Sequence, residues 1–385
     1  MRLRTQVGIV GAGPAGLALS QLLRARGIES VIIERHSRSH VEARVRAGVL
    51  EPHSADILEA CGLGDVIRRD GLVHDGVNLA VDGEIFRIDL GALAGRGLIV
   101  YGQTEIVHGL VAHSRVPILF EAEGVALHDA EIKPALTFTR HGEACRIDCD
   151  FLAGCDGQHG VSAAFVARSG GRIIEHSWPF AWLGILADCP PCHSELIYAR
   201  HARGFALASM RSRTRSRYYI QVPLGARVED WPDDKIWDEI ARRLGPAVSP
   251  APAASLEKSL APLRSHVVEP MRHGRLFLAG DAGHIVPPTG AKGLNLAVAD
   301  AELLAAAFAA FYEKGDTGAL DAYSDAALRR AWNAQRFSWW LTRLTHKFPE
   351  AENFAERLQE AEFDWLRRSK SAQMEFAQSY LGLSL

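Results

Sequence analysis

The sequence is poor in cysteine, and its few cysteines are scattered along the chain. Six cysteines in 385 residues are too few for a disulfide scaffold. One CxxC pair occurs, Cys189-Pro-Pro-Cys192, but a zinc ribbon needs a second pair and the sequence has none. A redox-active CxxC opens a helix after a strand, whereas this pair lies in a proline turn, so we interpret both as incidental thiols. Free thiols fit a reducing cytoplasm, and we expect no metal site.

Positive charge in excess and long apolar runs are also scarce. The formal net charge is −3, which argues against a general polyanion binder, so no nucleic-acid partner is expected. We find no run approaching the roughly 20 apolar residues that a membrane span needs, and expect no membrane partner. Apolar residues make up 48% and charged residues 23% of the chain, as in soluble globular proteins. The chain is long enough for two or three compact units, and we expect it in the cytoplasm.

The N-terminal segment has the pattern of a dinucleotide-binding unit. A strand at 6–10 is followed by the turn GAGPAG, a helix at 14–26 and a second strand at 30–34. Gly11 and Gly13 allow a tight turn close to a pyrophosphate, and Gly16 lets helix and strand pack closely. Glu34 ends the second strand, where a carboxylate suits a ribose hydroxyl pair. A plain glycine-rich turn is the alternative, but this context favours a dinucleotide site.

The later pattern predicts an α/β chain with α+β elements, in which a Rossmann-like domain is interrupted and then resumed. Residues 1–172 form the first domain, with a small β insertion at about 71–90. Residues 173–273 are β-rich, and we expect them to hold the substrate. Residues 274–385 return to the first domain and continue into helices.

Two further loops follow strands and carry an Asp beside a Gly: Asp156-Gly157 and Gly280-Asp281. Together with GAGPAG, in this order and spacing, they resemble the motifs of the FAD-dependent aromatic monooxygenases of group A. The chain is most similar to the branch that acts on 4-hydroxybenzoate. The matching segments span most of the chain and include RVRAGVLE (44–51), YGQTE (101–105), GFALASMRSRTRSRYYIQVPL (204–224), HIVPPTGAKGLN (284–295) and SYLGL (379–383).

The resemblance implies a reaction and its cofactors. FAD reduced by NADPH or NADH would react with O2 to a flavin C4a-hydroperoxide, which would hydroxylate 4-hydroxybenzoate at C3 to 3,4-dihydroxybenzoate. The implied FAD-binding residues are Gly11, Gly13, Ala15, Gly16, Glu34, Arg35, Arg44, Arg46, Val49, Gln103, Asp281, Lys292, Leu294 and Asn295. The implied nicotinamide nucleotide contacts are Arg35, His40, His159 and Arg264.

The β-rich region contains candidates for binding a substrate carboxylate. Ser209 and Arg211 are two residues apart on one predicted strand, so they share a face, and Arg217 and Tyr219 share a face of the next. A planar guanidinium beside hydroxyls can hold a carboxylate bidentately. A solvated basic hairpin or a nucleic-acid patch is the alternative, which the negative total charge disfavours. The resemblance implies that Ser209, Arg211 and Tyr219 bind the substrate.

The resemblance also implies a proton relay. Tyr198 and Tyr380 match a pair that hydrogen-bonds the substrate phenol and passes its proton outward. His74 matches the surface end of that relay, where we expect an ordinary histidine pKa. Pro288 would turn its carbonyl toward the substrate phenol, and Lys292 would add positive charge near the flavin.

The sequence departs from the well-known NADPH-dependent members near the nucleotide groove. They have Ser at Ala15 and Tyr at His40, and they lack an acid near Glu42. An acid repels a 2′-phosphate, so use of NADH, alone or beside NADPH, is at least as well supported as strict NADPH use.

Three alternatives stay open: a hydroxylase of a related benzoate such as 3-hydroxybenzoate or 4-aminobenzoate, a non-catalytic flavin-binding sensor, and a nicotinamide dehydrogenase. The apolar helical C-terminus, including Trp339 and Trp340, suggests a homodimer, with core packing as the alternative. Gly283 has no functional explanation from sequence.

Overall fold

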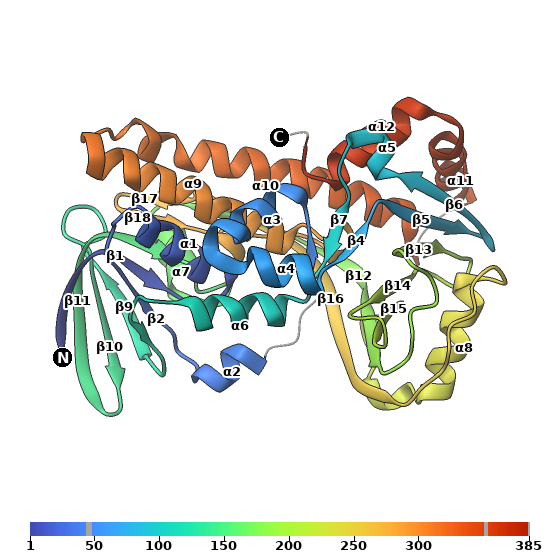
Figure 1. The fold of residues 1–385 in the computed structure, drawn as a ribbon, viewed down its shortest axis with the longest axis horizontal. Coiled ribbons are helices and arrows are strands. Elements are labelled where there is room, and N and C mark those ends of the chain that lie inside the picture. The colour runs from blue at the N-terminus through green and yellow to red at the C-terminus, as the bar shows by residue number, and fades with distance from the viewer. Residues whose placement is uncertain (44–47, 350–352, 384–385) are drawn as a thin grey trace.

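The structure is a computed structural model that describes residues 1–43, 48–349 and 353–383. Within these residues the strands form two eight-stranded sheets and one three-stranded sheet. Figure 1 shows the first large sheet at the left and the second at the right. The long helices α9 (Gly293–Lys314) and α10 (Gly318–Thr345) lie against each other along the upper side.

The first sheet is mainly parallel. Its strands are β1 (Arg2–Val10), β2 (Ser30–Ile33), β8 (Ile118–Leu119), β9 (Glu123–His128), β10 (Ala135–Arg140), β11 (Glu143–Gly154), β17 (Arg272–His273) and β18 (Leu276–Leu278). The parallel strands run in the order β18-β11-β1-β2-β8, while β9 and β10 form an antiparallel meander with β11. Because β18 follows every strand of the second sheet except the two-residue β19, the first unit is interrupted and resumed, as the sequence predicts.

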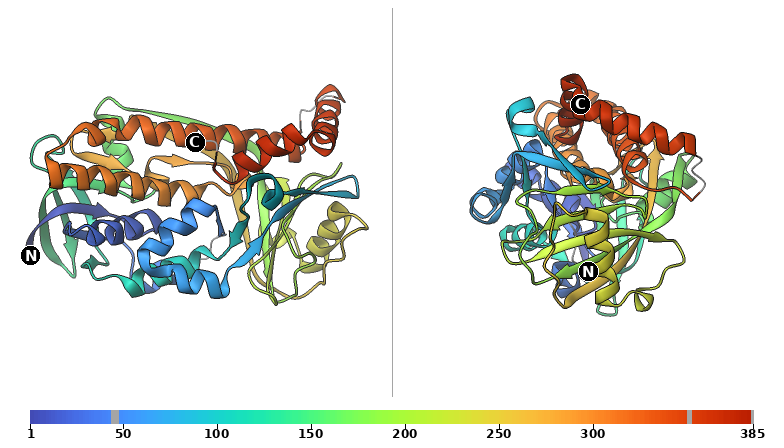
Figure 2. Two further views of the ribbon diagram at one scale, coloured as in Figure 1. Left: turned by 45° about the horizontal axis from the view of Figure 1, so that its top comes forward. Right: turned by 90° about the vertical axis from the view of Figure 1, so that its right-hand side faces the viewer.

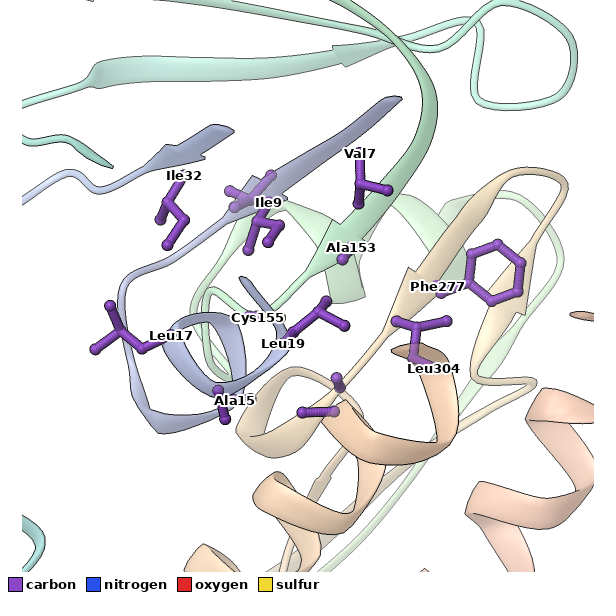
Figure 3. Close-up of a cluster of buried hydrophobic side chains, with 14 of the residues drawn as sticks. Val7, Ile9, Ala15, Leu17, Leu19, Ile32, Ala153, Cys155, Phe277 and Leu304 are labelled. Carbon is purple, nitrogen blue, oxygen red and sulfur yellow. The ribbon is translucent and has the colours of Figure 1, made fainter. Parts of the chain in front are cut away.

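Apolar strands and helices enclose the core of this unit. The last four residues of β1, Val7–Val10, and all of β2 are buried, because parallel strands in the middle of this sheet are covered on both faces. Helix α1 (Pro14–Ala25) packs against α9 and against α6 (Gln103–His113). Figure 3 shows Val7 and Ile9 on β1 and Leu17 on α1 within one cluster of buried side chains, and all three are fully buried.

The second sheet is the β-rich region. Its strands are β5 (Gly76–Val81), β6 (Glu84–Asp89), β12 (Arg172–Ala187), β13 (Ile197–Arg200), β14 (Ala206–Met210), β15 (Ser216–Pro223), β16 (Ser255–Glu269) and β19 (His284–Ile285). They run in the order β19-β16-β12-β15-β14-β13-β5-β6. The hairpin expected near 71–90 is therefore β5–β6, and through β5 it pairs with β13 and extends the second sheet. The right-hand view of Figure 2 looks onto this sheet and α8 (Asp233–Leu244).

Short elements link the sheets. The small sheet has the order β3-β7-β4, from Val49–Leu50, Leu98–Val100 and Leu72–His74. The remaining helices are α2 (Arg38–Ala43), α3 (Pro52–Leu58), η1 (Glu59–Leu63), α4 (Gly64–Asp70), α5 (Leu90–Ala94), α7 (Val161–Arg168), η2 (Val228–Asp230), η3 (Gly280–Ala282), η4 (Pro288–Gly290), α11 (Asn353–Arg368) and α12 (Lys370–Tyr380).

Helix α9 corrects one expectation from the sequence. It is long and apolar enough to cross a membrane by length and composition, with a mean hydropathy of 1.6 over its most apolar window. In the structure 67% of that window is buried inside the protein. A core helix meets the same test as a membrane span, so the burial accounts for its composition.

Candidate active site

The N-terminal glycine turn is shaped by contacts that only glycine permits. Gly11 has a φ of +105°, and a Cβ there would lie 2.4 Å from the carbonyl oxygen of Cys155. A Cβ on Gly16 would lie 2.1 Å from the carbonyl oxygen of Gly11. Gly13 precedes α1 as its N-cap, and no side chain caps the first turn of this helix. The helix therefore begins with its positive end facing an open turn, as phosphate binding requires.

The other two loops meet this turn at the same edge of the sheet. β18, β11 and β1 are neighbouring parallel strands, so the loops that follow them lie side by side. A Cβ on Gly280, whose φ is +63°, would lie 3.1 Å from the Cβ of Ala15. Glu34 is almost buried beside the turn, where its carboxylate accepts hydrogen bonds from the backbone N–H groups of Ala12 and His36, both at 2.9 Å.

The loop after β18 joins several elements. Asp281 is part of η3 and is partly exposed. The carbonyl of Pro288 accepts a hydrogen bond from Ala291 N–H at 3.0 Å. Asn295 donates to the carbonyls of Val49 and Ala291 and accepts from Glu51 N–H, so it holds β3 against the start of α9. Gly283 has an ordinary backbone, but a Cβ there would lie 2.5 Å from Cε of Met271, which explains its small side chain.

Lys292 connects this loop to the end of the chain. Its Nζ forms an ion pair with Glu51 at 2.5 Å and donates to the carbonyls of Ser379 and Tyr380 at 2.7 and 2.9 Å. Lys292 and Asn295 also line a cavity of about 410 Å³ between α3, α9, α10 and the C-terminal segment. Gly11 and Asp281 do not line this cavity, so it does not cover the whole predicted flavin site.

The predicted tyrosine pair is assembled. The hydroxyl oxygens of Tyr198 and Tyr380 lie 2.7 Å apart, and both side chains are buried. Burial raises the pKa of Tyr198 to about 12, although the hydrogen bond from Tyr380 opposes this shift. Burial also raises the pKa of Tyr380. Each hydroxyl can donate and accept, so the pair can transmit a proton without either tyrosine remaining ionised.

His74 differs from its sequence-based expectation of a surface position and an ordinary pKa. The side chain is completely buried on β4, with Nε2 3.3 Å from the sulfur of Met210 and no hydrogen-bond partner for Nδ1 among the described residues. Burial lowers the pKa of His74 to about 4. The expectation is therefore wrong, because the strand register turns this side chain inward.

One face of the second sheet carries the carboxylate candidates. Tyr198, Leu207 and Tyr219 are direct cross-strand neighbours on β13, β14 and β15, and Ser209 is two residues beyond Leu207. These four side chains therefore share a face. Gly184 opposes Tyr219, and a Cβ there would lie 2.9 Å from the tyrosine ring, so Gly184 makes room for it.

Arg211 follows β14 next to Tyr219 and is short of partners. Its Nη2 is buried and has no hydrogen-bond partner among the described residues. Burial lowers the pKa of Arg211, while the electrostatic effect of the nearby Tyr219 opposes the shift. A buried guanidinium nitrogen without a partner is costly, so it requires an acceptor, and a carboxylate fits best.

Arg217 is a second buried guanidinium at this site, and we named it from sequence only as a neighbour. It lies over the Tyr219 ring, 5.2 Å from the centroid, and its Nε and Nη1 also lack partners among the described residues. The alternation of β15 indicated its face, but only the packing reveals the missing partners.

The remaining predicted residues are more peripheral. Val49, Gln103 and Leu294 are partly buried at the starts of β3, α6 and α9. Four nicotinamide candidates are exposed: Arg35, His40, His159 and Arg264. Arg44 and Arg46 lie outside the described residues.

The predicted cofactor fits this arrangement. The glycine turn leaves room at a helix N-terminus for a pyrophosphate, and Glu34 offers carboxylate oxygens beside it. The start of α9 supplies the positive end of a helix at the other end of the loop cluster, whereas the charge of Lys292 is paired with Glu51. These donor and acceptor groups suit an extended dinucleotide such as FAD.

Comparison with known proteins agrees with the site. The family described as "FAD binding domain" matches residues 4–338. The chain is 48% identical to the p-hydroxybenzoate hydroxylase of Acinetobacter baylyi, over 99% of this chain and 96% of that protein. It is 26% identical to the 3-amino-4-hydroxybenzoate 2-monooxygenase of Streptomyces cremeus, over 78% and 77% of the two chains.

A solved structure supports the fold. The p-nitrophenol 4-monooxygenase PnpA of Pseudomonas putida superposes with a TM-score of 0.84 over 99% of both chains, at 20% identity. The two relatives are described as a hydroxylase and a monooxygenase. The match to the Acinetobacter baylyi protein covers nearly the whole length of both chains. The chain therefore belongs to the FAD-dependent aromatic monooxygenases, the flavoprotein family that includes p-hydroxybenzoate hydroxylase.

Proposed function

We propose that this enzyme hydroxylates 4-hydroxybenzoate at C3, giving 3,4-dihydroxybenzoate, with O2 and NADH or NADPH as co-substrates. One observation carries the proposal. Tyr198 on the second sheet and Tyr380 on α12 form a buried hydroxyl pair, and on the same sheet Arg211 has a buried nitrogen, Nη2, without an acceptor among the described residues. 4-Hydroxybenzoate has a phenol and a carboxylate at opposite ends of one ring, and so matches both groups. The near full-length similarity to a p-hydroxybenzoate hydroxylase supports this choice.

The residues divide the work. Arg211, Ser209 and Tyr219 bind the carboxylate, and the partner-free nitrogen of Arg211 gains its acceptor when substrate enters. Tyr198 hydrogen-bonds the phenol, with the Pro288 carbonyl on the same side of the substrate. Tyr198 accepts a hydrogen bond from the phenol while it donates its own to Tyr380, and partial transfer of the phenol proton along this chain makes the ring carbon beside the phenol more electron-rich. Bound FAD supplies the activation of O2, and the protein supplies orientation and electrostatics.

The flavin is held by the loops that meet at the sheet edge. The N-terminal turn binds the pyrophosphate, Glu34 the ribose, and Asp281 the ribityl chain. Lys292, Leu294 and Asn295 face the end of the ring system that becomes negative on reduction. His74 has no part in this proposal, because it is buried and no hydrogen bond joins it to Tyr380 among the described residues.

A substrate panel tests the proposal. Purified yellow enzyme is supplied with NADH or NADPH and with 4-hydroxybenzoate, 3-hydroxybenzoate, 4-aminobenzoate, benzoate or phenol, and the product is identified. We expect 3,4-dihydroxybenzoate from 4-hydroxybenzoate, and weak binding of phenol, which lacks the carboxylate. Product from another benzoate but not from 4-hydroxybenzoate would reassign the substrate. Absence of turnover with all five would instead favour a flavin-binding sensor.

The proposed assembly is a cytoplasmic homodimer. Helix α11 exposes Phe354, Leu358 and Trp365 along one stripe, while Phe363 and Leu366 face the protein. Trp340 packs against Phe376, but Trp339 is partly exposed. Apolar residues on both faces of a surface helix suit a second copy of the chain. Light scattering of the wild type and of Leu358→Glu tests this, and a monomeric wild type would refute it.

A further inference from the structure

A buried histidine–aspartate pair lies directly behind the loop that carries Asp281. Asp300 on α9 is 0% exposed and His284 on β19 is 1% exposed. Oδ2 of Asp300 accepts a hydrogen bond from Nε2 of His284 at 2.7 Å and another from Gly280 N–H at 2.9 Å. A single carboxylate oxygen thus holds both ends of the turn 280–284.

The pair is fully buried, and the Asp300 carboxylate favours the protonated form of His284. Burial acts to lower the pKa of His284, but the adjacent Asp300 carboxylate outweighs it and the pKa is raised. His284 Nδ1 and Asp300 Oδ1 have no hydrogen-bond partners among the described residues. A buried ion pair of this kind costs free energy compared with apolar packing, so its presence calls for a role beyond stability.

The backbone at this point leaves little freedom. Gly280 is left-handed and is wedged between Ala15 on α1 and Ala297 on α9, 3.1 and 3.2 Å from the position of a Cβ. Asp281 is the next residue. A small movement of Gly280 would therefore shift Asp281 relative to both α1 and α9.

We propose that Asp300, with His284, is a positioning residue for FAD: it fixes the Gly280–Asp281 turn to α9 and so sets the distance between Asp281 and the helix N-terminus at Leu294. This inference rests on the proposed role of Asp281 at the ribityl chain. Asp300 itself does not touch the flavin. It acts through the Gly280 N–H and the His284 ring, so its effect must pass through the position of Asp281.

The test measures FAD affinity of the full-length protein by equilibrium dialysis, with the flavin absorption spectrum and the melting temperature of the apoprotein and holoprotein. Asp300→Asn keeps an acceptor of the same shape and removes the charge, and His284→Gln keeps a donor. We expect at least a tenfold rise in the FAD dissociation constant for Asp300→Asn and a smaller rise for His284→Gln, with an altered absorption spectrum in both. Glu239→Gln is the control, because Glu239 is another buried acid paired with a cation, Arg243, in the second sheet's region.

A double-mutant cycle with Asp281→Asn separates this inference from the proposed function. If Asp300 acts through Asp281, the two effects on FAD affinity are not additive. Fully additive effects would overturn the inference while leaving Asp281 as a ligand. An unchanged FAD affinity in Asp281→Asn would instead overturn the proposed role of Asp281. If the substitutions lower the melting temperatures of apoprotein and holoprotein equally and leave the FAD affinity and spectrum at wild-type values, the pair has only a structural role. If Asp300→Asn does not fold, the cycle with His284→Gln gives the same decision.

Discussion

The hydroxyl oxygens of Tyr198 and Tyr380 lie 2.7 Å apart between β13 and the last helix, and both side chains are almost inaccessible to solvent. A substrate phenol that reaches Tyr198 would therefore exchange its proton with a buried chain rather than with water. In the proposed arrangement, binding and activation of the substrate are separable, because one group would hold the carboxylate and another would take part in proton transfer.

Replacement of Tyr198 by Phe removes the first hydroxyl of the chain. We expect the dissociation constant of 4-hydroxybenzoate to rise by no more than about fivefold, since one neutral hydrogen bond is lost. The yield of hydroxylated product per nicotinamide oxidised should fall by about tenfold or more, because the phenol proton loses its acceptor. Product and nicotinamide are measured in the same reaction, and unchanged coupling would disprove the role of Tyr198.

Replacement of Arg211 by Lys keeps the charge but removes the planar fork. A charge-assisted bidentate contact is worth about 1.5–3 kcal/mol, so we expect the substrate dissociation constant to rise by about 10- to 100-fold. Arg213→Lys is the matched control, because Arg213 lies exposed in the adjoining turn. Titration of the flavin absorbance with 4-hydroxybenzoate gives both constants, and equal effects of the two substitutions would contradict a specific carboxylate contact.

Two buried histidines predict how stability changes with pH. Burial lowers the pKa of His74 to about 4 and that of His346 to about 3. Nε2 of His346 accepts a hydrogen bond from Trp182 Nε1 at 2.7 Å, which requires the unprotonated nitrogen. The unfolded chain, with a histidine pKa near 6.5, binds more protons, so stability is complete above about pH 6.5 and is lost as pH falls toward 4.

Urea unfolding between pH 7 and pH 5 checks this expectation. Each histidine contributes a slope of up to about 1.4 kcal/mol per pH unit below pH 6.5. His346→Gln should reduce the slope by one such contribution, and His141→Gln, at an exposed turn, should leave it unchanged. A wild-type slope in His346→Gln would show that the histidine is not neutral in the folded state.

Substitution by alanine should have different effects at Gly16, in the N-terminal turn, and at Gly283, in the loop after β18. At Gly16 the added methyl would meet the backbone oxygen of Gly11, which cannot move away without opening the turn. At Gly283 it would meet the flexible end of Met271. We therefore expect Gly16→Ala to lose FAD, and Gly283→Ala to retain it at a stability cost of about 1–3 kcal/mol. Retained flavin absorbance in purified Gly16→Ala would contradict the tight turn.

Nucleotide preference depends on how fully Glu42 is neutralised. Its carboxylate forms an ion pair with Arg38 at 2.8 Å and lies 3.7 Å from His108, which weakens the repulsion that the sequence alone suggests. We expect Arg38→Gln to shift kcat/KM toward NADH and Glu42→Gln to shift it toward NADPH, each by a few-fold because the groups are near solvent. Steady-state rates with both nucleotides decide, and a preference unaffected by either change would place the 2′-phosphate elsewhere.

Local patterns predicted the parts of the site that depend on neighbours in sequence. GAGPAG lies between a strand and a helix and forms the expected turn. The family resemblance predicted the contact between Tyr198 and Tyr380, although 182 positions separate them. The βαβ unit and the interrupted first sheet also follow from hydrophobic periodicity, which directly reflects burial.

The features that sequence missed depend on which distant surface covers a residue. His74 was expected at the surface, but in the structure it is buried against Met210. The pairing of β5 with β13 could not be predicted from the sequence of either strand alone. The pair His284–Asp300 has no sequence signal, because 16 positions and a change of element separate its members. From the sequence, Glu42 was expected to repel a 2′-phosphate, but in the structure its carboxylate forms an ion pair with Arg38.

The position of β18 beside β11 has a consequence for dissecting this protein. The proposed flavin site is completed by β18 and the loop after it, which the chain supplies only after all strands of the second sheet except the short β19. The N-terminal unit is therefore not a module that can be cut out or grafted with its cofactor. A fragment that keeps GAGPAG but lacks Gly280 would lack the loop that lies against Ala15 in the N-terminal turn.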